Sequence, residues 1–219
     1  MTTHKTIVAA GLAAGLLLAA CGGSSTTTAS QPSTLPATKT GSPSASHSSG
    51  VTPISPEAPV PTESSPPGDI PDNTQYVPYR SKVAGFKIST PEGWSRSSTK
   101  SSVTFTDKLN TVVVSWAPAS SAPTVQTANS TEVPMLRNTT RAFRLASVKA
   151  GSLPAGPTVV IEYQANSDPN PVTGKQYRLD VLRYELFKNG QETVITLLSP
   201  VGADNVDPWR IVTESFGWA

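Results

Sequence analysis

The sequence predicts an α+β domain over residues 76–219, in which helices pack on an antiparallel β-sheet of about six or seven strands. Three observations support this fold class. Every aromatic residue lies from Tyr76 onward, so the large core-forming side chains are confined to the last 144 residues (219 − 75). Most of this region alternates apolar and polar residues, which is typical of half-buried strands. Two segments change instead to helical spacing.

The alternation places the strands in order along the domain. A turn at 91–94 follows the first strand, and a turn at 107–110 precedes the third. Asn189-Gly190 predicts a tight hairpin between the last two strands, because both positions of such a turn take positive φ. The residues that define the strands are Phe86 and Ile88; Val103 and Phe105; Val112, Val114 and Trp116; Leu145 and Ser147; Val159, Ile161 and Tyr163; and the segments 175–187 and 193–199.

The longest strand, 175–187, changes phase in its middle. Its apolar residues first fall at odd positions and then at even ones, and this shift predicts a β-bulge. The residues concerned are Tyr177, Leu179 and Val181, followed by Leu182, Tyr184 and Leu186.

Helical spacing predicts one helix over about 129–144, with Pro134 tolerated near its start. A second helix is expected at the C-terminus, capped by Asp207 and with Pro208 in its first position. The apolar faces consist of Val133, Leu136, Thr140 and Phe143 in the first helix and Trp209, Val212 and Phe216 in the second.

Residues 1–20 have the layout of a secretory signal peptide. A short polar start with Lys5 precedes the apolar run 7–20, which is too short to span a bilayer. The run ends in Leu18-Ala19-Ala20-Cys21, which resembles the lipobox of bacterial lipoproteins. This resemblance implies that Cys21 carries a lipid anchor, such as palmitate and other acyl chains, and becomes the new N-terminus. Two chains make such anchoring stable. The alternative is an ordinary signal peptide with an incidental thiol.

Residues 21–75 are predicted to be a disordered tether between the anchor and the domain. Within 22–67, 20 of the 46 residues are Ser or Thr and 9 are Pro, and no aromatic residue occurs. Such a segment buries too little apolar surface to offset its ordering entropy. Its composition also suits O-glycosylation, with a bare spacer as the alternative.

The domain lacks the side chains that most enzyme classes need. Its only candidate histidines, His4 and His47, lie in the signal peptide and the tether, so neither a Ser-His-Asp arrangement nor a His/Cys zinc site is expected. No glycine-rich phosphate loop occurs. With 15 Lys and Arg against 11 Asp and Glu, the region 76–219 is only mildly basic, which argues against nucleic acid as a partner. We therefore expect no enzyme, no cofactor and no metal.

Carboxylates are the remaining catalytic candidates. If the strand 175–187 bulges, Asp180 and Glu185 could share a face near Glu162, as an envelope hydrolase would require. We expect instead a solvated sheet face that carries alternating charges, and the paired arrangement is the alternative.

Two sets of residues are candidates for binding. Arg137, Arg141 and Arg144 fall on one side of the first predicted helix and could contact a partner protein or anionic headgroups, or else form a solvated face. Trp94, Trp116 and Trp209 could line a ligand cleft, or else pack in the core. Trp218 is the tryptophan expected to be most exposed.

The motif Gly85-Phe86-x-Ile88-x-x-Pro91-x-Gly93-Trp94, with later hairpins and a C-terminal helix ending in Ser215-Phe216, resembles the PsbP-like domain. With the lipobox and the tether, the chain resembles actinobacterial lipoproteins of the LpqN/LpqT type. The resemblance implies a binding or adaptor module on the outer face of the cell membrane, with an envelope protein or lipid as its partner. A structural surface antigen without a small ligand is the alternative.

Overall fold

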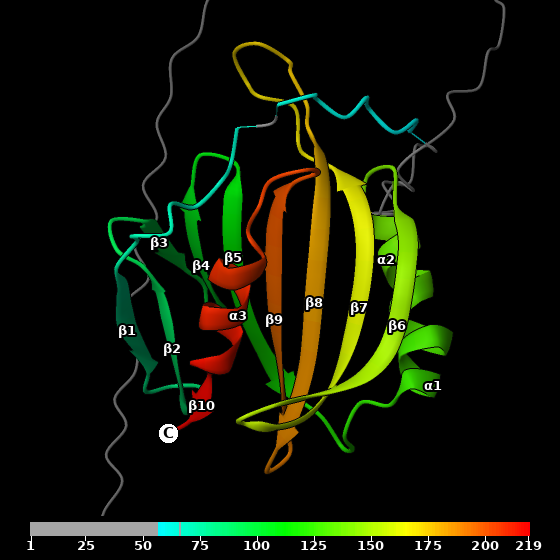
Figure 1. Cartoon of the computed structure of the whole chain (residues 1–219). Coiled ribbons are helices and arrows are strands. Elements are labelled where there is room, and N and C mark those ends of the chain that lie inside the picture. Colours follow the sequence, from blue (N-terminus) through cyan, green and yellow to red (C-terminus); the bar gives the residue numbers. More distant parts are fainter. Residues whose placement is uncertain (1–56, 66) are drawn as a thin grey trace, which may run out of the picture. The chain divides into compact units, whose positions relative to one another are not determined.

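A computed structural model describes residues 57–65 and 67–219 (Figure 1). The predicted signal peptide, the lipobox residues Leu18 to Ala20, Cys21 and most of the predicted tether lie outside the described residues. No helix in the described part of the chain is long and apolar enough to cross a membrane. The helices are α1 (Val125–Thr127), the π-helix η1 (Ala128–Glu132), α2 (Val133–Thr139) and α3 (Val206–Glu214). The strands are β1 (Tyr76–Ser81), β2 (Phe86–Pro91), β3 (Ser95–Ser98), β4 (Ser102–Asp107), β5 (Asn110–Pro118), β6 (Arg144–Leu153), β7 (Gly156–Asn166), β8 (Arg178–Lys188), β9 (Gln191–Pro200) and β10 (Gly217–Trp218).

The strands form two sheets, and all their pairings are antiparallel. The large sheet has seven strands in the order β3-β4-β5-β9-β8-β7-β6, and the small sheet has the order β1-β2-β10. Asn189 and Gly190 both have positive φ, 51° and 78°, in the hairpin between β8 and β9. The predicted hairpin and the predicted α+β fold class are therefore confirmed.

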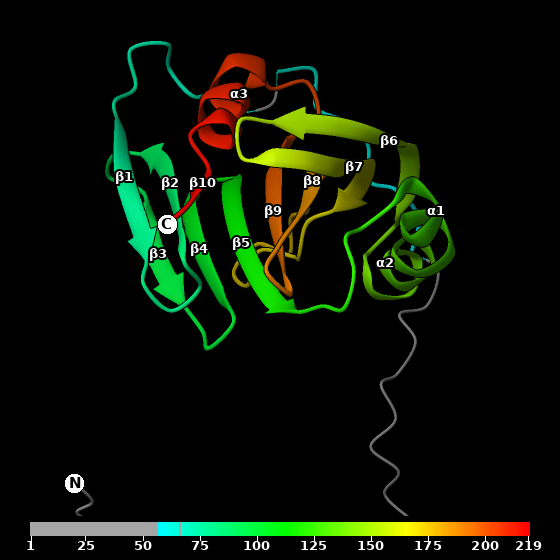
Figure 2. The same ribbon diagram turned by 90° about the horizontal axis from the view of Figure 1, so that it is seen from below.

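The two faces of the large sheet are covered by different elements (Figure 2). The small sheet and α3 pack on one face, which we call the inner face. The segment α1-η1-α2 packs on the other, outer face, over β7 and the beginning of β8. Since successive strand residues point to opposite faces, even-numbered residues of β7 and β8 face α3 and odd-numbered ones face α2.

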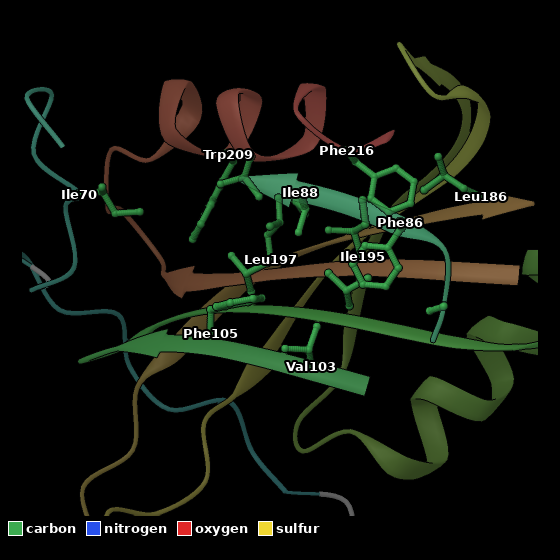
Figure 3. Close-up of a cluster of buried hydrophobic side chains, with 14 residues drawn as sticks. Ile70, Phe86, Ile88, Val103, Phe105, Leu186, Ile195, Leu197, Trp209 and Phe216 are labelled. Carbon is green, nitrogen blue, oxygen red and sulfur yellow. The ribbon is translucent and has the colours of Figure 1, made fainter. Parts of the chain in front are cut away.

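The main core lies between α3, the small sheet and β4, β5 and β9 (Figure 3). Phe86 is fully buried at its centre, with ring centroids 5.6 Å from Phe216 and 5.7 Å from Trp116. Trp209 and Val212 on α3, with Phe216 just beyond its end, supply one continuous buried face. These contacts fix α3 across the sheet.

Both helices begin earlier than predicted. The first helical segment spans 125–139 in place of 129–144. It also ends earlier, because Thr140 is extended and Ala142 adopts a positive φ of 45°. Phe143 lies beyond the end of the helix, and its ring packs on Tyr163 of β7 with ring centroids 5.1 Å apart. Its burial therefore belongs to the sheet and not to a helical face. In α3, Asn205 and not Asp207 occupies the N-cap position.

The predicted bulge in 175–187 is wrong. From Arg178 to Lys188, β8 pairs with β7 and with β9 without any shift of register. A shift occurs instead in the edge strand β6, between Leu145 and Ser147. The phase change in β8 has another cause: Leu179 and Val181 are covered on the outer face, whereas Leu186 is covered on the inner face.

Residues in 57–65 and 67–75 contact the domain, although the sequence places them in the tether. Ile70 is buried, and its amide donates to Oδ1 of Asn205 at 2.8 Å. Glu57 forms an ion pair with Arg141 at 2.9 Å and accepts a hydrogen bond from Gln176 at 2.9 Å. These contacts extend the folded unit on the N-terminal side of Tyr76.

Candidate functional site

A groove of about 680 Å³ lies on the inner face between α3 and the strands β6, β7 and β8. The groove exists because the small sheet and α3 cover the β4-β5-β9 side of the inner face, whereas β6 to β8 extend beyond them. Its volume falls within the range of small-molecule sites. The residues that define it are Lys149 and Leu153 on β6, Val160, Glu162 and Gln164 on β7, Asp180, Leu182 and Tyr184 on β8, and Trp209, Arg210 and Glu214 on α3.

The floor of the groove is apolar. Val160 is buried, and Leu153, Leu182 and Tyr184 are only partly buried, so each presents apolar surface to the groove. Desolvation raises the pKa of the Tyr184 hydroxyl, which therefore remains a neutral hydrogen-bonding group at physiological pH. This floor suits a ligand that is mainly apolar and carries a few hydrogen-bonding atoms.

Charged pairs line the rim. Nζ of Lys149 contacts Oε1 of Glu162 at 2.6 Å, and Oγ of Ser147 donates to Oε2 of the same carboxylate at 2.9 Å. The bond from Lys149, the first of these, holds the pKa of Glu162 below its ordinary value. Gln164 donates to Asp180 at 3.0 Å. Because these carboxylates already have partners, the rim offers ordered polar contacts and no free acid.

The carboxylate pair that the alternative hydrolase hypothesis needs does not form. Asp180 faces the groove, whereas Glu185 lies on the outer face, because five positions along an unbulged strand reverse the direction of a side chain. Glu162 shares the groove with Asp180, but its lowered pKa makes it unsuited to act as a general acid. The alternative in which Asp180 and Glu185 converge on one face depended on the bulge and is therefore contradicted.

Glu185 is instead buried beside Arg183. Nε of Arg183 contacts Oε1 of Glu185 at 2.8 Å, and the same guanidinium reaches Glu132 of η1 at 3.0 Å. Desolvation raises the pKa of Glu185, while Arg183 opposes the shift. These contacts join η1 to β8, so the group links two elements on the face opposite to the groove.

Of the three tryptophans predicted to line a cleft, only Trp209 borders the groove. Trp94 packs edge-to-face on Trp209 at 6.3 Å, and Trp116 lies against Phe86 in the core. Trp218 is partly buried, and its indole N–H donates to the carbonyl of Ala155 at 3.0 Å. The interior between the sheets is filled by these rings, so the groove lies beside the core and not within it.

The three arginines predicted on one helical face are separated by the early end of α2. Arg137 is on the helix and stacks over the ring of Phe143 at 5.6 Å, whereas Arg141 lies in the following turn and pairs with Glu57. Arg144 is exposed at the start of β6. Each therefore has a different environment, and they do not form one continuous basic face on a helix.

Within residues 57–65 and 67–219, no three His, Cys, Asp or Glu side chains are grouped to hold a metal ion. Apart from Trp209, Asp180 and Glu162, the groove residues, with Leu182 and Tyr184 foremost, were not predicted as a site. The sequence feature that could have predicted them is the shift of apolar residues from odd to even positions at Leu182. From this residue onward, the apolar side chains of β8 lie on the inner face.

No protein-family model matches the sequence, and no curated protein matches it. Solved structures do resemble the fold. The cyanobacterial PsbP protein of Synechocystis aligns over 69% of this chain and 98% of its own length, at 16% identity and a TM-score of 0.50. The Ran-binding protein Mog1p of Saccharomyces cerevisiae aligns over 67% and 96%, at 8% identity and 0.45.

LpqN, a protein involved in cell envelope biogenesis in Mycobacterium tuberculosis, aligns over 67% of this chain and 91% of its own length, at 13% identity and a TM-score of 0.40. The similarity to the cyanobacterial protein supports a PsbP-like fold for this chain.

Proposed function

We propose that this protein is a non-enzymatic binding module of the cell envelope, anchored through a lipid on Cys21 to the outer face of the cell membrane. The lipobox-like sequence Leu18-Ala19-Ala20-Cys21 and the preceding apolar run support the anchor. The Ser/Thr/Pro-rich segment that follows suits a spacer that carries the domain away from the membrane. The partner is an envelope lipid or an envelope protein.

The groove beside α3 is the observation that supports a binding role. It combines an apolar floor at Leu182 and Tyr184 with a rim whose polar groups are already positioned by internal hydrogen bonds. Such a surface binds an apolar chain or apolar side chains along its floor and orients their polar neighbours at the rim. The rim carries Lys149 and Arg210 against Glu162, Asp180 and Glu214, so it does not favour a strongly acidic ligand.

The anchor is tested by expressing the full chain in a bacterium that processes lipoproteins. We expect the protein in the membrane fraction with an intact mass that includes acyl chains, and we expect Cys21→Ser to remove both properties. A full-length, unacylated mass for the native sequence would contradict the anchor. Hexose increments in the same spectrum would test O-glycosylation of the spacer.

The binding role is tested by photo-crosslinking in intact cells. A benzophenone amino acid replaces Leu182 in the groove or, as a matched control, Thr104 on the outer face of β4. We expect one specific adduct, a lipid or a single protein, from position 182 and none of it from position 104. Identical sets of abundant proteins at both positions would contradict the proposal.

A further inference from the structure

The turn between β1 and β2 presents an exposed apolar side chain on a rigid support. Val83 is 85% exposed at the tip of this hairpin. The next residue, Ala84, is buried, and its amide donates to Oγ of Ser81 at 3.2 Å. Its carbonyl accepts a hydrogen bond from Nε2 of Gln191 at 2.9 Å. The turn is therefore tied to β9, and the exposure of Val83 results from an ordered backbone.

Positive charges surround this valine. Arg80 and Lys87 are direct cross-strand partners, and both are exposed. Like charges in such a pair are destabilising unless something neutralises them. Lys82 precedes Val83, and Lys188 of β8 lies at the same end of the domain, with its ammonium 5.9 Å from the ring of Trp218.

Among the described residues, no carboxylate forms a salt bridge with Arg80, Lys82, Lys87 or Lys188. The carboxylate of Ala219, whose amide bonds to the carbonyl of Gly85, offsets at most one of these four charges. Residues 57–219 as a whole carry 15 Lys and Arg and 15 Asp and Glu, so their net charge is zero. The four cations therefore form a local cluster of positive charge, which does not follow from an overall basic composition.

We propose that this hairpin tip, defined as Arg80, Lys82, Val83, Lys87 and Lys188, docks on an anionic phospholipid surface. The cations contact lipid phosphates, and Val83 enters the boundary between headgroups and acyl chains. An acidic polymer would neutralise the charges, but it would give the exposed valine no apolar layer. The combination of the two features favours a membrane.

This contact is separate from the groove, which lies between α3 and β6 to β8 and has a slightly acidic rim. It also does not need the lipid on Cys21, because the hairpin supplies its own apolar and cationic groups. Failure of the docking proposal is therefore distinguishable from failure of the proposed function.

The test uses the mature chain, residues 21–219, with Cys21→Ser so that no acyl chain contributes. Sedimentation is measured with vesicles of equimolar phosphatidylglycerol and phosphatidylcholine and with vesicles of phosphatidylcholine alone. We expect binding only to the anionic vesicles, and weaker binding when salt is raised well above about 0.1 M. Each cation near such a surface contributes roughly fivefold to affinity, so Lys82→Gln/Lys87→Gln lowers it roughly 25-fold.

Arg137→Gln/Arg144→Gln is the matched control, since it removes two exposed cations from another part of the domain and is expected to leave vesicle binding unchanged. Val83→Ser removes the apolar group without changing the charge, and it is expected to weaken vesicle binding without changing the unfolding midpoint, because the side chain is exposed. Equal losses in the two double variants, or no binding to anionic vesicles, would overturn the proposal. If Val83→Ser has no effect and dextran sulfate competes fully, the surface recognises acidic polymers and not membranes.

Discussion

Substitution of Asn205 by alanine tests whether residues 57–75 belong to the folded unit. Asn205 is 2% exposed, and its side chain forms three hydrogen bonds. Oδ1 accepts from the amide of Ile70 at 2.8 Å, and Nδ2 donates to the carbonyl of Gly68 at 2.9 Å and to Oδ1 of Asn110 at 3.2 Å. These bonds join the start of α3 to the start of β5 and to the segment at Gly68 and Ile70, which lies more than 130 positions before Asn205 in the sequence.

In Asn205→Ala, the buried amide of Ile70 loses its acceptor, which costs about 1–3 kcal/mol. The carbonyl of Gly68 keeps a donor, because Nδ2 of Asn110 also reaches it at 2.7 Å. The two remaining bonds of Asn205 therefore add only about 0.5–1.5 kcal/mol together. We expect the free energy of unfolding to fall by about 1.5–4.5 kcal/mol in total.

Urea unfolding of the mature chain, followed by tryptophan fluorescence, measures this change. With an m-value of about 2 kcal/mol/M, the midpoint is expected to fall by about 1–2 M. Asn138→Ala, at an exposed position of α2, is the control and is expected to change stability by less than about 0.5 kcal/mol. A change of the same small size in Asn205→Ala would refute the view that this asparagine holds residues 57–75 on the domain.

Two further predictions concern the core and the N-terminal segment. Phe86→Ala is expected to lower the free energy of unfolding by about 3–5 kcal/mol, because the ring is fully buried among other aromatic rings; urea unfolding measures it, and Phe86→Leu should cost much less. The hydrogen bond from Gln176, followed by those from Asn166 and the charge of Arg141, holds the pKa of Glu57 below its ordinary value of 4.5. Since the folded pKa is the lower one, Glu57 stabilises the fold above about pH 4.5, and this contribution disappears as the pH falls through the lowered pKa. Unfolding measured against pH should therefore show native protein and Glu57→Gln converging in acid, and a constant difference would contradict this assignment.

Alternation and turn chemistry predicted the elements that bury their own side chains. The strands at Phe86, Val112 and Ile161 follow from alternation, and the β8–β9 hairpin follows from Asn189-Gly190. The edge strand β3 was missed because its four residues, Ser95 to Ser98, are all exposed and pair with β4 without burying any side chain. A hydrophobic pattern cannot reveal a strand that buries nothing.

The placement of residues 57–75 could not be predicted for a different reason. The composition of this segment resembles that of a disordered tether, and among its described residues only Ile70 enters the core. Its position depends on asparagines far along the chain, Asn166 near Val60 and Asn205 near Ile70. Side-chain bonds to a distant backbone have no local signature, so composition alone indicates disorder.

The phase change in β8 was detected in the sequence but was given the wrong cause. A bulge would shift the register, yet β8 keeps its register with both neighbours over its whole length. The apolar side chains change face because the covering layer changes: α2 covers Leu179 and Val181 on the outer face, whereas the inner-face core begins at Leu186. Leu182 and Tyr184 lie between these two covers, already turned to the inner face but beyond the edge of α3. They remain partly exposed for this reason, so the same change of cover that produced the phase shift also produced the floor of the groove.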